Sequence, residues 1–140
     1  MIRKASANWK GGLKDGKGTI SSDSKVLSST QYSFGTRFEN GIGTNPEELI
    51  AAAHAACFSM ALSAELGKAG ITPESIDTTA AIKFEKLETG WTITESHLDV
   101  SAKIPGADPK AFETAANTAK ANCPISKVLN TNVTMSTKLN

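Results

Sequence analysis

The sequence lacks any run of lysine or arginine, and its formal net charge is only +1. A nucleic acid or an acidic membrane surface is therefore not expected as a partner. Residues 1–4 form a small basic cluster, but Ser6, Asn8 and Lys10 leave no apolar run after it. Because a secretory signal needs such a run, we expect a cytoplasmic protein.

Internal repeats, low-complexity tracts and domain linkers are also missing. The 140 residues, with a mass of 14.7 kDa, are enough for one domain around one hydrophobic core. With 39% apolar and 21% charged residues, the composition is that of a soluble globular protein. We predict a single domain over residues 1–140.

Cysteine and histidine are scarce, with two of each in the chain. Disulfides are uncommon in the cytosol, and those that form there are usually transient and redox-active. A buried cysteine is otherwise simply a small apolar residue. Both interpretations are open for Cys57 and Cys123 taken alone, and their spacing in the sequence does not show whether they meet.

A long apolar helix is predicted from Pro46 to about Leu66. Asn45 is a good N-cap, Pro46 suits the first helical position, and Glu47 and Glu48 suit the positive end of the helix dipole. Apolar residues cover almost every face of this helix, so we expect it to be buried. Polar interruptions and many alanines argue against a membrane span. One small chain does not cover such a helix on all sides, and a homodimer would supply the missing cover.

Strands are predicted on both sides of this helix. Before it, the segments Ile2–Trp9, Gly18–Ser22 and Gln31–Phe38 have strand-like composition, and a turn signal at residues 15–16 separates the first two. After it, alternating apolar residues predict a hairpin of residues 76–84 with 91–104. The alternation changes parity near Glu95–His97, which indicates a bulge or a change of face there.

The last third of the chain predicts one more helix and one more strand. The helix begins at Asp108-Pro109 and ends near Cys123, because the residue before a proline disfavours the helical region. The strand covers Asn132–Leu139, with its apolar residues on one face. The order of strands, helix, hairpin, helix and strand indicates an α+β fold.

The two cysteines have different predicted surroundings. Cys57 lies in the middle of the long helix, where burial raises the pKa of a thiol and where the helix N-terminus is too distant to help. A reactive Cys57 therefore needs a cation brought from elsewhere. Cys123 lies at a helix end before a proline, where we expect a more accessible and more mobile thiol.

His54 precedes Cys57 by three residues, so the two side chains share one helix face. This spacing fits a histidine that activates a cysteine, or two metal ligands with Cys123 as a third. A role for His54 in a structural polar network is the more common outcome. Two alternative functions follow from the residues alone: a metal-dependent hydrolase using these three side chains, and a non-enzymatic dimeric binding module with inert cysteines.

Two stretches resemble motifs of the OsmC/Ohr family of hydroperoxide reductases. Thr44–Phe58 combines an Asn-Pro-Glu helix start with a cysteine ten residues after the glutamate, and Ala121–Ser126 contains a late Cys-Pro. The resemblance covers essentially the whole chain. Thr36–Glu39 favours the osmotically inducible OsmC branch over the Ohr branch.

The resemblance implies an α+β fold that forms an intertwined homodimer, with two long central helices and antiparallel sheets wrapped around them. It also implies a peroxidatic thiol at Cys57, a resolving thiol at Cys123, an activating cation at Arg37 and its carboxylate partner at Glu47. Family members need no metal or haem. They act on organic hydroperoxides and hydrogen peroxide. Lipoyl-bearing proteins or other dithiols then reduce the disulfide that forms.

These implied roles fit the chemistry of peroxide reduction. Attack on a peroxide needs a low-pKa sulfur and stabilisation of the departing oxygen, and Arg37 would supply both. A sulfenic acid at the first cysteine then condenses with the second. Phe34, Phe38, Phe58 and Met60 are assigned to an apolar lining that would suit a hydrocarbon-bearing peroxide.

Helix geometry indicates which chain would supply the carboxylate. Glu47 and Cys57 are ten residues apart, which is about 15 Å along a helix axis. A glutamate side chain does not span that distance. We therefore expect Glu47, and with it Arg37, to face Cys57 of the other subunit in a homodimer.

Overall fold

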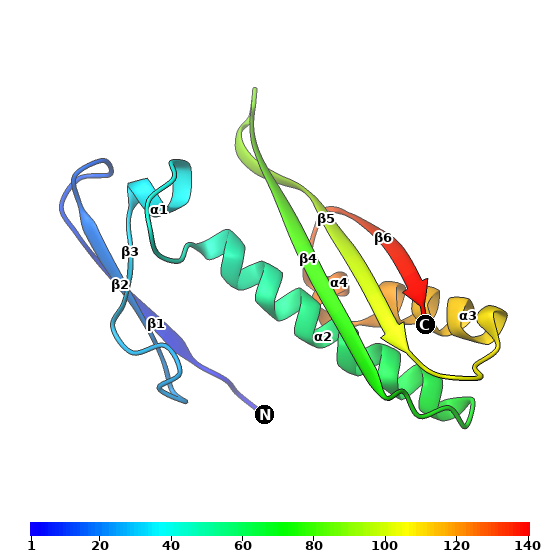
Figure 1. Ribbon diagram of the computed structural model, residues 1–140. Helices are drawn as coiled ribbons and strands as arrows, with labels where there is room; N and C mark the ends of the chain where they lie inside the picture. Colours follow the sequence, from blue (N-terminus) through cyan, green and yellow to red (C-terminus); the bar gives the residue numbers. More distant parts are fainter. The chain divides into compact units, whose positions relative to one another are not determined.

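Ten strands and helices follow one another along the chain in the order β1–β2–β3–α1–α2–β4–β5–α3–α4–β6 (Figure 1). The computed structural model describes all residues, 1–140, in two compact units, Met1–Leu49 and Ile50–Asn140. Helix α2 (Pro46–Lys68) begins in the first unit and continues through the second. A single domain over 1–140 stays a prediction.

The first unit contains an antiparallel sheet of three strands: β1 (Ala5–Lys10), β2 (Lys17–Ser22) and β3 (Thr30–Tyr32). The predicted turn signal at residues 15–16 lies in the connection between β1 and β2. Gly18 in β2 allows Trp9 and Tyr32 to pack together across the strand, with ring centroids 5.4 Å apart. A Cβ at position 18 would collide with both rings.

The strand prediction for Gln31–Phe38 is wrong beyond Tyr32, because helix α1 (Phe34–Phe38) begins there. The Ser33 hydroxyl accepts a hydrogen bond from the Thr36 N–H at 3.3 Å, and the Thr36 hydroxyl accepts one from the Ser33 N–H at 2.9 Å. This capping box satisfies donors that a strand would have to pair elsewhere. Local capping therefore outweighs the strand preference of the aromatic residues.

Helix α2 begins where the sequence predicts it. The Asn45 side-chain oxygen accepts from the Glu48 N–H at 2.8 Å, as an N-cap does. By length and composition α2 is the one helix apolar enough to cross a membrane, with a mean hydropathy of 1.5, a property that core helices of soluble proteins share. Phe58, Leu62 and Leu66 of α2 are fully buried in the second unit, so α2 is a core helix.

A single chain covers α2 on one side only. Its opposite face is exposed in the second unit and carries Ala52, Ala53, Ala56, Met60 and Ala64. This agrees with the expectation that one small chain does not cover the long helix on all sides. The reason is the small size of the unit, whose other helices and strands are too few to surround α2.

The second unit contains a sheet with the strand order β4 (Ser75–Leu87), β5 (Gly90–Lys103) and β6 (Asn132–Leu139). The predicted hairpin is the antiparallel pair β4–β5, and β6 joins β5 in parallel. Helices α3 (Pro109–Asn122) and α4 (Pro124–Val128) form the crossover between β5 and β6. The α+β class predicted from the sequence is confirmed. The expectation of antiparallel sheets is wrong for this unit, because the α3–α4 crossover returns the chain so that β6 runs parallel to β5.

The predicted irregularity in the hairpin lies slightly before its expected position. Lys83 pairs with Glu95 and Phe84 pairs with Ile93, so Thr94 is the extra residue of a bulge. The bulge changes the parity of β5, so that Ser96, rather than Glu95, begins the inward-facing series.

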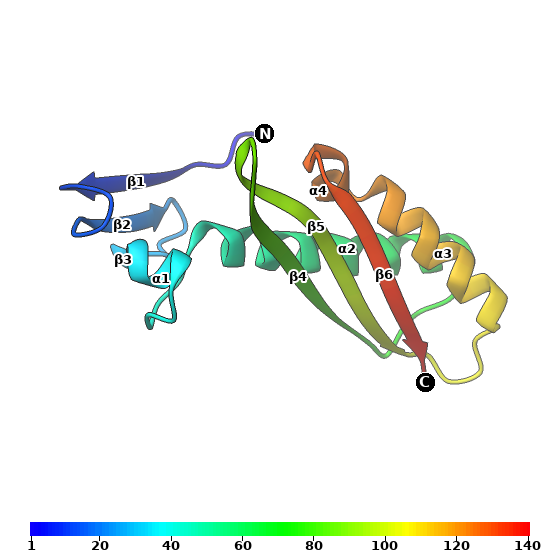
Figure 2. The ribbon, with the colours of Figure 1, turned by 90° about the horizontal axis from the view of Figure 1, so that it is seen from above.

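One face of this sheet forms the core. Alternate residues of β5 are buried, and α2 and α3 both cover that face (Figures 1 and 2). Each fully buried large apolar side chain contributes about 1.5–3 kcal/mol of transfer free energy. The buried core residues are Phe58, Leu62, Leu66, Leu98, Val100, Ala102, Ile104, Phe112, Ala115, Ala116, Ala119 and Cys123.

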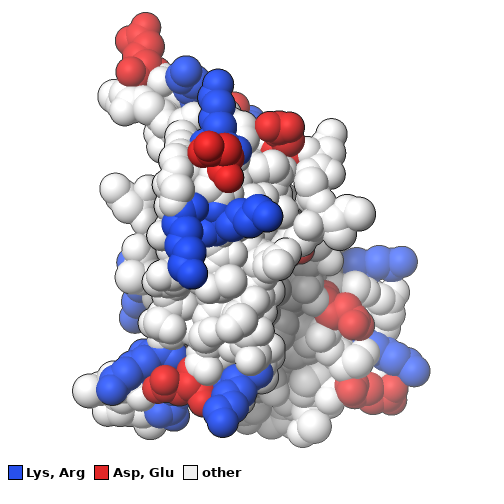
Figure 3. Space-filling view, turned by 90° about the vertical axis from the view of Figure 1, so that its left-hand side faces the viewer, with Lys and Arg blue, Asp and Glu red and all other residues white.

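Charged side chains of both signs are mixed on the face of the molecule that Figure 3 shows. Lysine and arginine side chains lie beside aspartate and glutamate side chains, with uncharged surface between them. The distribution agrees with the formal net charge of +1.

Candidate active site

The second unit brings the two cysteines together. Cys57 lies on α2, and Cys123 is the residue between α3 and α4. Both are free, and their sulfur atoms are 2.8 Å apart. A disulfide has an S–S distance of about 2.05 Å, so bond formation needs only a small movement. The sequence alone did not establish this contact.

The expected order of accessibility is wrong. Cys123 is fully buried, whereas Cys57 is half-buried. The helix end at Cys123 is not frayed, because its backbone N–H bonds to the Ala119 carbonyl and its carbonyl accepts from the Lys127 N–H. Cys123 therefore lies beneath the surface, beside the more accessible Cys57.

Burial has the largest influence on both thiols and acts to raise the pKa of each. At Cys57 the hydrogen bond with Cys123 adds to this effect, and the pKa lies above its ordinary value. At Cys123 the polar surroundings from Cys57, Ser126 and Ile125 outweigh burial, and the pKa lies below its ordinary value. These neighbours leave Cys57 a weak nucleophile, so its activation needs a positive charge that they do not supply.

His54 occupies a buried polar network instead of a metal site. Its Nδ1 contacts the Ser96 hydroxyl and its Nε2 contacts the Ser126 hydroxyl, each at 2.7 Å. Its side chain is fully buried, and desolvation lowers the pKa of the imidazole. Because both ring nitrogens bond to serines, they do not converge with Cys57 and Cys123 on one metal ion.

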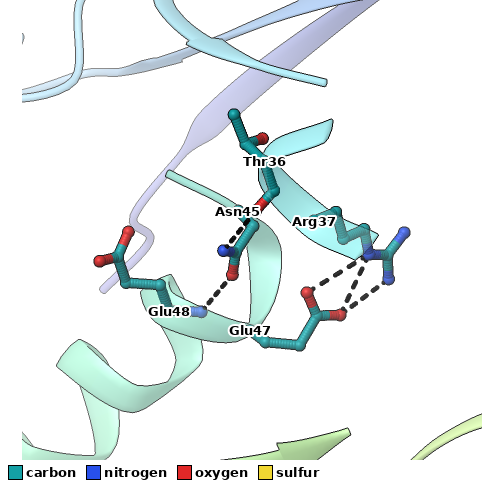
Figure 4. A network of polar contacts seen from close by, with 5 residues as sticks. All are labelled: Thr36, Arg37, Asn45, Glu47 and Glu48. Carbon is teal, nitrogen blue, oxygen red and sulfur yellow. Dashed lines mark hydrogen bonds and ion pairs between the residues drawn. The ribbon is translucent and has the colours of Figure 1, made fainter. Parts of the chain in front are cut away.

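The first unit brings Arg37 and Glu47 together (Figure 4). Arg37 Nη2 lies 2.8 Å from Glu47 Oε1, and Nε also donates to both carboxylate oxygens. The side chain of Arg37 is 37% exposed and that of Glu47 is 11% exposed. This two-point pairing fixes the orientation of the guanidinium plane, while part of the Arg37 side chain stays exposed to solvent.

Asn45 connects the helices that carry these two residues. Its side-chain amide donates to the Thr36 carbonyl at 2.9 Å, while its side-chain oxygen accepts from the Glu48 N–H (Figure 4). One side chain therefore caps α2 and holds the backbone next to Arg37.

An apolar pocket lies beside Arg37 in the first unit. Phe34 and Phe38 are packed against each other with centroids 4.8 Å apart, and the Arg37 guanidinium carbon is 5.3 Å from the Phe38 ring centroid. The cavity has a volume of about 250 Å³. Its lining consists of Trp9, Leu13, Tyr32, Ser33, Phe34, Arg37 and Phe38.

The other two residues assigned to a substrate lining belong to the second unit. Phe58 is fully buried in its core, and Met60 is 76% exposed on the uncovered face of α2. Neither lines the pocket beside Arg37.

Sequence reasoning missed Ser96, Ser126, Trp9, Leu13 and Tyr32. Serine is too common for its contact with a histidine 42 or 72 residues away to be read from the sequence. The pocket residues come from β1, β3 and the loops beside them, and pairing of the strands brings them together.

Comparisons with known proteins agree with the resemblance seen in the motifs. The OsmC-like protein family matches residues 38–138. Peroxiredoxin OsmC of Escherichia coli strain K12 is 51% identical over 137 residues, covering 98% of this chain and 96% of the relative.

Solved structures show the same fold. The organic hydroperoxide resistance protein OhrB of Bacillus subtilis superposes with a TM-score of 0.74 at 28% identity, covering 98% of both chains. An organic hydroperoxide resistance protein from Elizabethkingia anophelis has a TM-score of 0.75 at 26% identity, covering 100% of this chain and 99% of the other. With its paired cysteines and its match to the E. coli protein along nearly the whole length, this chain belongs to the OsmC/Ohr family, in the OsmC branch.

Proposed function

We propose that this protein is a thiol peroxidase in which Cys57 attacks hydroperoxides and Cys123 resolves the product. The observation that carries the proposal is the 2.8 Å separation of the two free sulfur atoms. The Cys57 thiolate displaces an alcohol, or water from hydrogen peroxide, and becomes a sulfenic acid. Cys123 then displaces the sulfenic hydroxyl as water, and a disulfide forms.

Arg37 is the activating cation in this proposal. A guanidinium near Cys57 would lower the pKa of its thiol and stabilise the negative charge on the departing oxygen. The two-point contact with Glu47 supports this role, because it holds the guanidinium in one orientation before substrate binds. Part of the Arg37 side chain stays exposed and can meet a ligand.

The active form is a homodimer with shared sites. The uncovered face of α2 supports this proposal, because alanines and Met60 there are more stable against a second copy than in water. Glu47 and Cys57 lie ten residues apart on α2, about 15 Å along its axis. Arg37 and Glu47 therefore serve the partner subunit's Cys57.

The pocket beside Arg37 holds the organic part of the peroxide. Its aromatic walls and volume of about 250 Å³ suit a small hydrocarbon or aryl group next to the cation. Phe34 and Phe38 keep the role assigned from the sequence, and Trp9, Leu13 and Tyr32 join them. Phe58 supports α2 from the core, and Met60 belongs to the proposed dimer contact.

Turnover needs only an external dithiol in this scheme. A lipoyl-bearing protein or another dithiol reduces the Cys57–Cys123 disulfide by thiol–disulfide exchange. No metal or haem takes part in either step. A reducing cytoplasm is the compartment where such a cycle can be completed.

The deciding experiment compares wild type with Cys57→Ser in a peroxide-consumption assay with a dithiol. Serine is a very poor nucleophile at neutral pH, so the variant is expected to lose turnover entirely. Substantial residual peroxidase activity in Cys57→Ser would refute the assignment.

A metal-dependent hydrolase is the competing function. The serine contacts of both His54 nitrogens count against it. Metal analysis of protein purified without chelator separates the two, since stoichiometric zinc would favour the hydrolase.

A further inference from the structure

Two lysines lie directly opposite each other in the sheet of the first unit. Lys10, at the end of β1, pairs with Lys17, at the start of β2. Directly opposite residues of antiparallel strands have Cβ atoms about 4.5–5.5 Å apart, and like charges at such positions are destabilising. In the two sheets together, no other directly opposite pair consists of two residues of the same charge. Such a local exception is typical of a functional site.

No carboxylate of the chain neutralises this pair. Lys83 on β4 forms an ion pair with Glu85, whereas Lys10 and Lys17 form none. Asp15, the nearest acidic residue in the sequence, lies in the loop between β1 and β2 and is not paired with either lysine. Two adjacent positive charges without a carboxylate attract an anion more strongly than a single lysine does.

A polar groove extends from the two lysines across the same face of the sheet. Asn8, Thr19 and Gln31 lie side by side on β1, β2 and β3, because Thr19 is opposite both of the others. Asn8 precedes Lys10 by two residues and Thr19 follows Lys17 by two, so all share one face. The five side chains line one cavity of about 430 Å³, and no acidic residue lines it. A cavity of this volume suits a small molecule.

The neutral side chains of the polar groove are suited to hydroxyl groups. An amide and a hydroxyl each donate and accept hydrogen bonds, as the hydroxyl groups of a ligand do. The side chains of Asn8, Thr19 and Gln31 form no hydrogen bond within the protein, so their donors and acceptors are available to a ligand.

We propose that the polar groove binds a small phosphate monoester with a hydroxyl-rich remainder, such as a sugar phosphate. A phosphate monoester carries a charge of about −1.5 to −2 at neutral pH and three acceptor oxygens, which matches the two ammonium groups of Lys10 and Lys17. The amides of Asn8 and Gln31 and the hydroxyl of Thr19 bind the hydroxyl groups of the remainder. The bound phosphate also removes the repulsion between the lysines.

This site is separate from the groups proposed to reduce peroxides. Trp9 alternates with Asn8 and Lys10 along β1, so its ring lies on the opposite face of the sheet, in the aromatic pocket beside Arg37. Only Tyr32 and Ser33, at the edge strand β3 and just after it, line both cavities. The inference therefore goes beyond peroxide reduction and does not depend on it.

Calorimetric titration of the full chain with ribose 5-phosphate at low ionic strength tests the site. Saturable binding of one molecule per chain is expected, and Lys10→Gln should weaken it roughly tenfold or more, the loss expected for a hydrogen bond between charged groups. Ribose, which lacks the phosphate, and succinate, which carries two carboxylates, should bind at least tenfold more weakly. Absence of saturable ribose 5-phosphate binding, or succinate binding of equal affinity, would overturn the proposal.

Lys138→Gln is the matched control for Lys10→Gln. Lys138 is an exposed lysine on β6 that lies opposite the neutral Ser101 and forms no ion pair. The control removes one positive charge from a strand outside the polar groove, so it should bind ribose 5-phosphate as wild type does. Equal weakening in both variants would overturn the proposal, because net charge alone would then explain the binding.

Lys17→Glu separates loss of binding from loss of folding. The substitution replaces the like-charge pair by an opposite-charge pair with Lys10, which should raise the urea midpoint of unfolding. It also places a negative charge in the polar groove and should abolish ribose 5-phosphate binding. Binding retained in this variant would overturn the proposal, and so would a urea midpoint below that of wild type, because the like-charge argument would then be wrong.

Discussion

At the scale of single residues, surroundings give the two cysteines different properties. Cys57 and Cys123 have sulfur atoms 2.8 Å apart, yet the pKa of the first is raised and that of the second is lowered. The polar groups next to the buried Cys123 act to lower the pKa of its thiol. In the proposed cycle, the positive charge that activates the more accessible Cys57 comes from Arg37.

Cys123→Ser should consume about one peroxide per site and then stall, because no thiol remains to condense with the sulfenic acid. Cys57 should accumulate as sulfenic and higher acids, which intact-mass measurement detects. Normal turnover of this variant with the usual dithiol would show that Cys123 is not the obligatory resolving residue.

Arg37→Ala should raise the pKa of Cys57 and slow its reaction with peroxide by roughly tenfold or more, since an adjacent opposite charge shifts a pKa by about 1–3 units. Thiol alkylation against pH measures the first effect, and stopped-flow mixing measures the second. Arg3→Ala, near the exposed N-terminus, is the control and should change neither. A Cys57 titration identical to wild type would remove Arg37 from the mechanism.

At the scale of helices, caps decide where the charged residues of the first unit lie. The capping box at Ser33 converts a segment with strand-like composition into α1, and Asn45 connects the start of α2 to the Thr36 carbonyl. Arg37 and Glu47 meet because these two short signals place them on adjacent helix ends.

Asn45→Ala should lower the free energy of unfolding by about 1–2 kcal/mol, because a cap and a further hydrogen bond are lost. It should also slow peroxide reduction, since Arg37 loses its support. Asp108→Ala is the control, because Asp108 caps α3 through the Lys110 and Ala111 N–H groups. Urea unfolding should show a similar stability loss for both variants, and only Asn45→Ala should react slowly. Equal reaction rates would contradict the role of Asn45.

At the scale of the whole molecule, the uncovered face of α2 and the distance along α2 both favour shared sites. After subunit exchange between Cys57→Ser protein and an Arg37→Ala, Glu47→Ala double variant, the heterodimer should have about half the activity of a wild-type dimer, because one of its two sites is intact. Verified heterodimers as inactive as their parents would show that each chain builds its own site.

The stability of the whole chain should depend on pH through His54. Above about pH 6.5 the imidazole is neutral in both the folded and the unfolded chain. Below it, the unfolded chain binds a proton that buried His54 resists, since desolvation lowers its pKa. The free energy of unfolding should therefore fall as the pH drops, until the folded-state pKa is reached. Urea unfolding across this pH range should show this decrease in the free energy of unfolding for wild type and His97→Gln, and a smaller decrease for His54→Gln. An equal pH dependence in all three proteins would contradict the role of His54.

Several parts of this protein follow from the sequence by itself. Asn45-Pro46 and Asp108-Pro109 are local signals, so both long helices begin where predicted. Alternating apolar residues define the hairpin and the last strand, and the spacing of the motifs around Cys57 and Cys123 identifies the family. Each of these depends on residues close together in the chain.

Only the tertiary structure decided how distant residues combine. The contact of Cys57 with Cys123, the serines around His54, and the aromatic pocket beside Arg37 each depend on packing of segments far apart in the sequence. The burial of Cys123 was mispredicted because a helix end is usually exposed, and here Cys123 belongs to the hydrophobic core of the second unit. Local patterns determine helices and strands. The pKa of a reactive thiol depends instead on all the groups packed around it, and these come from segments far apart in the sequence.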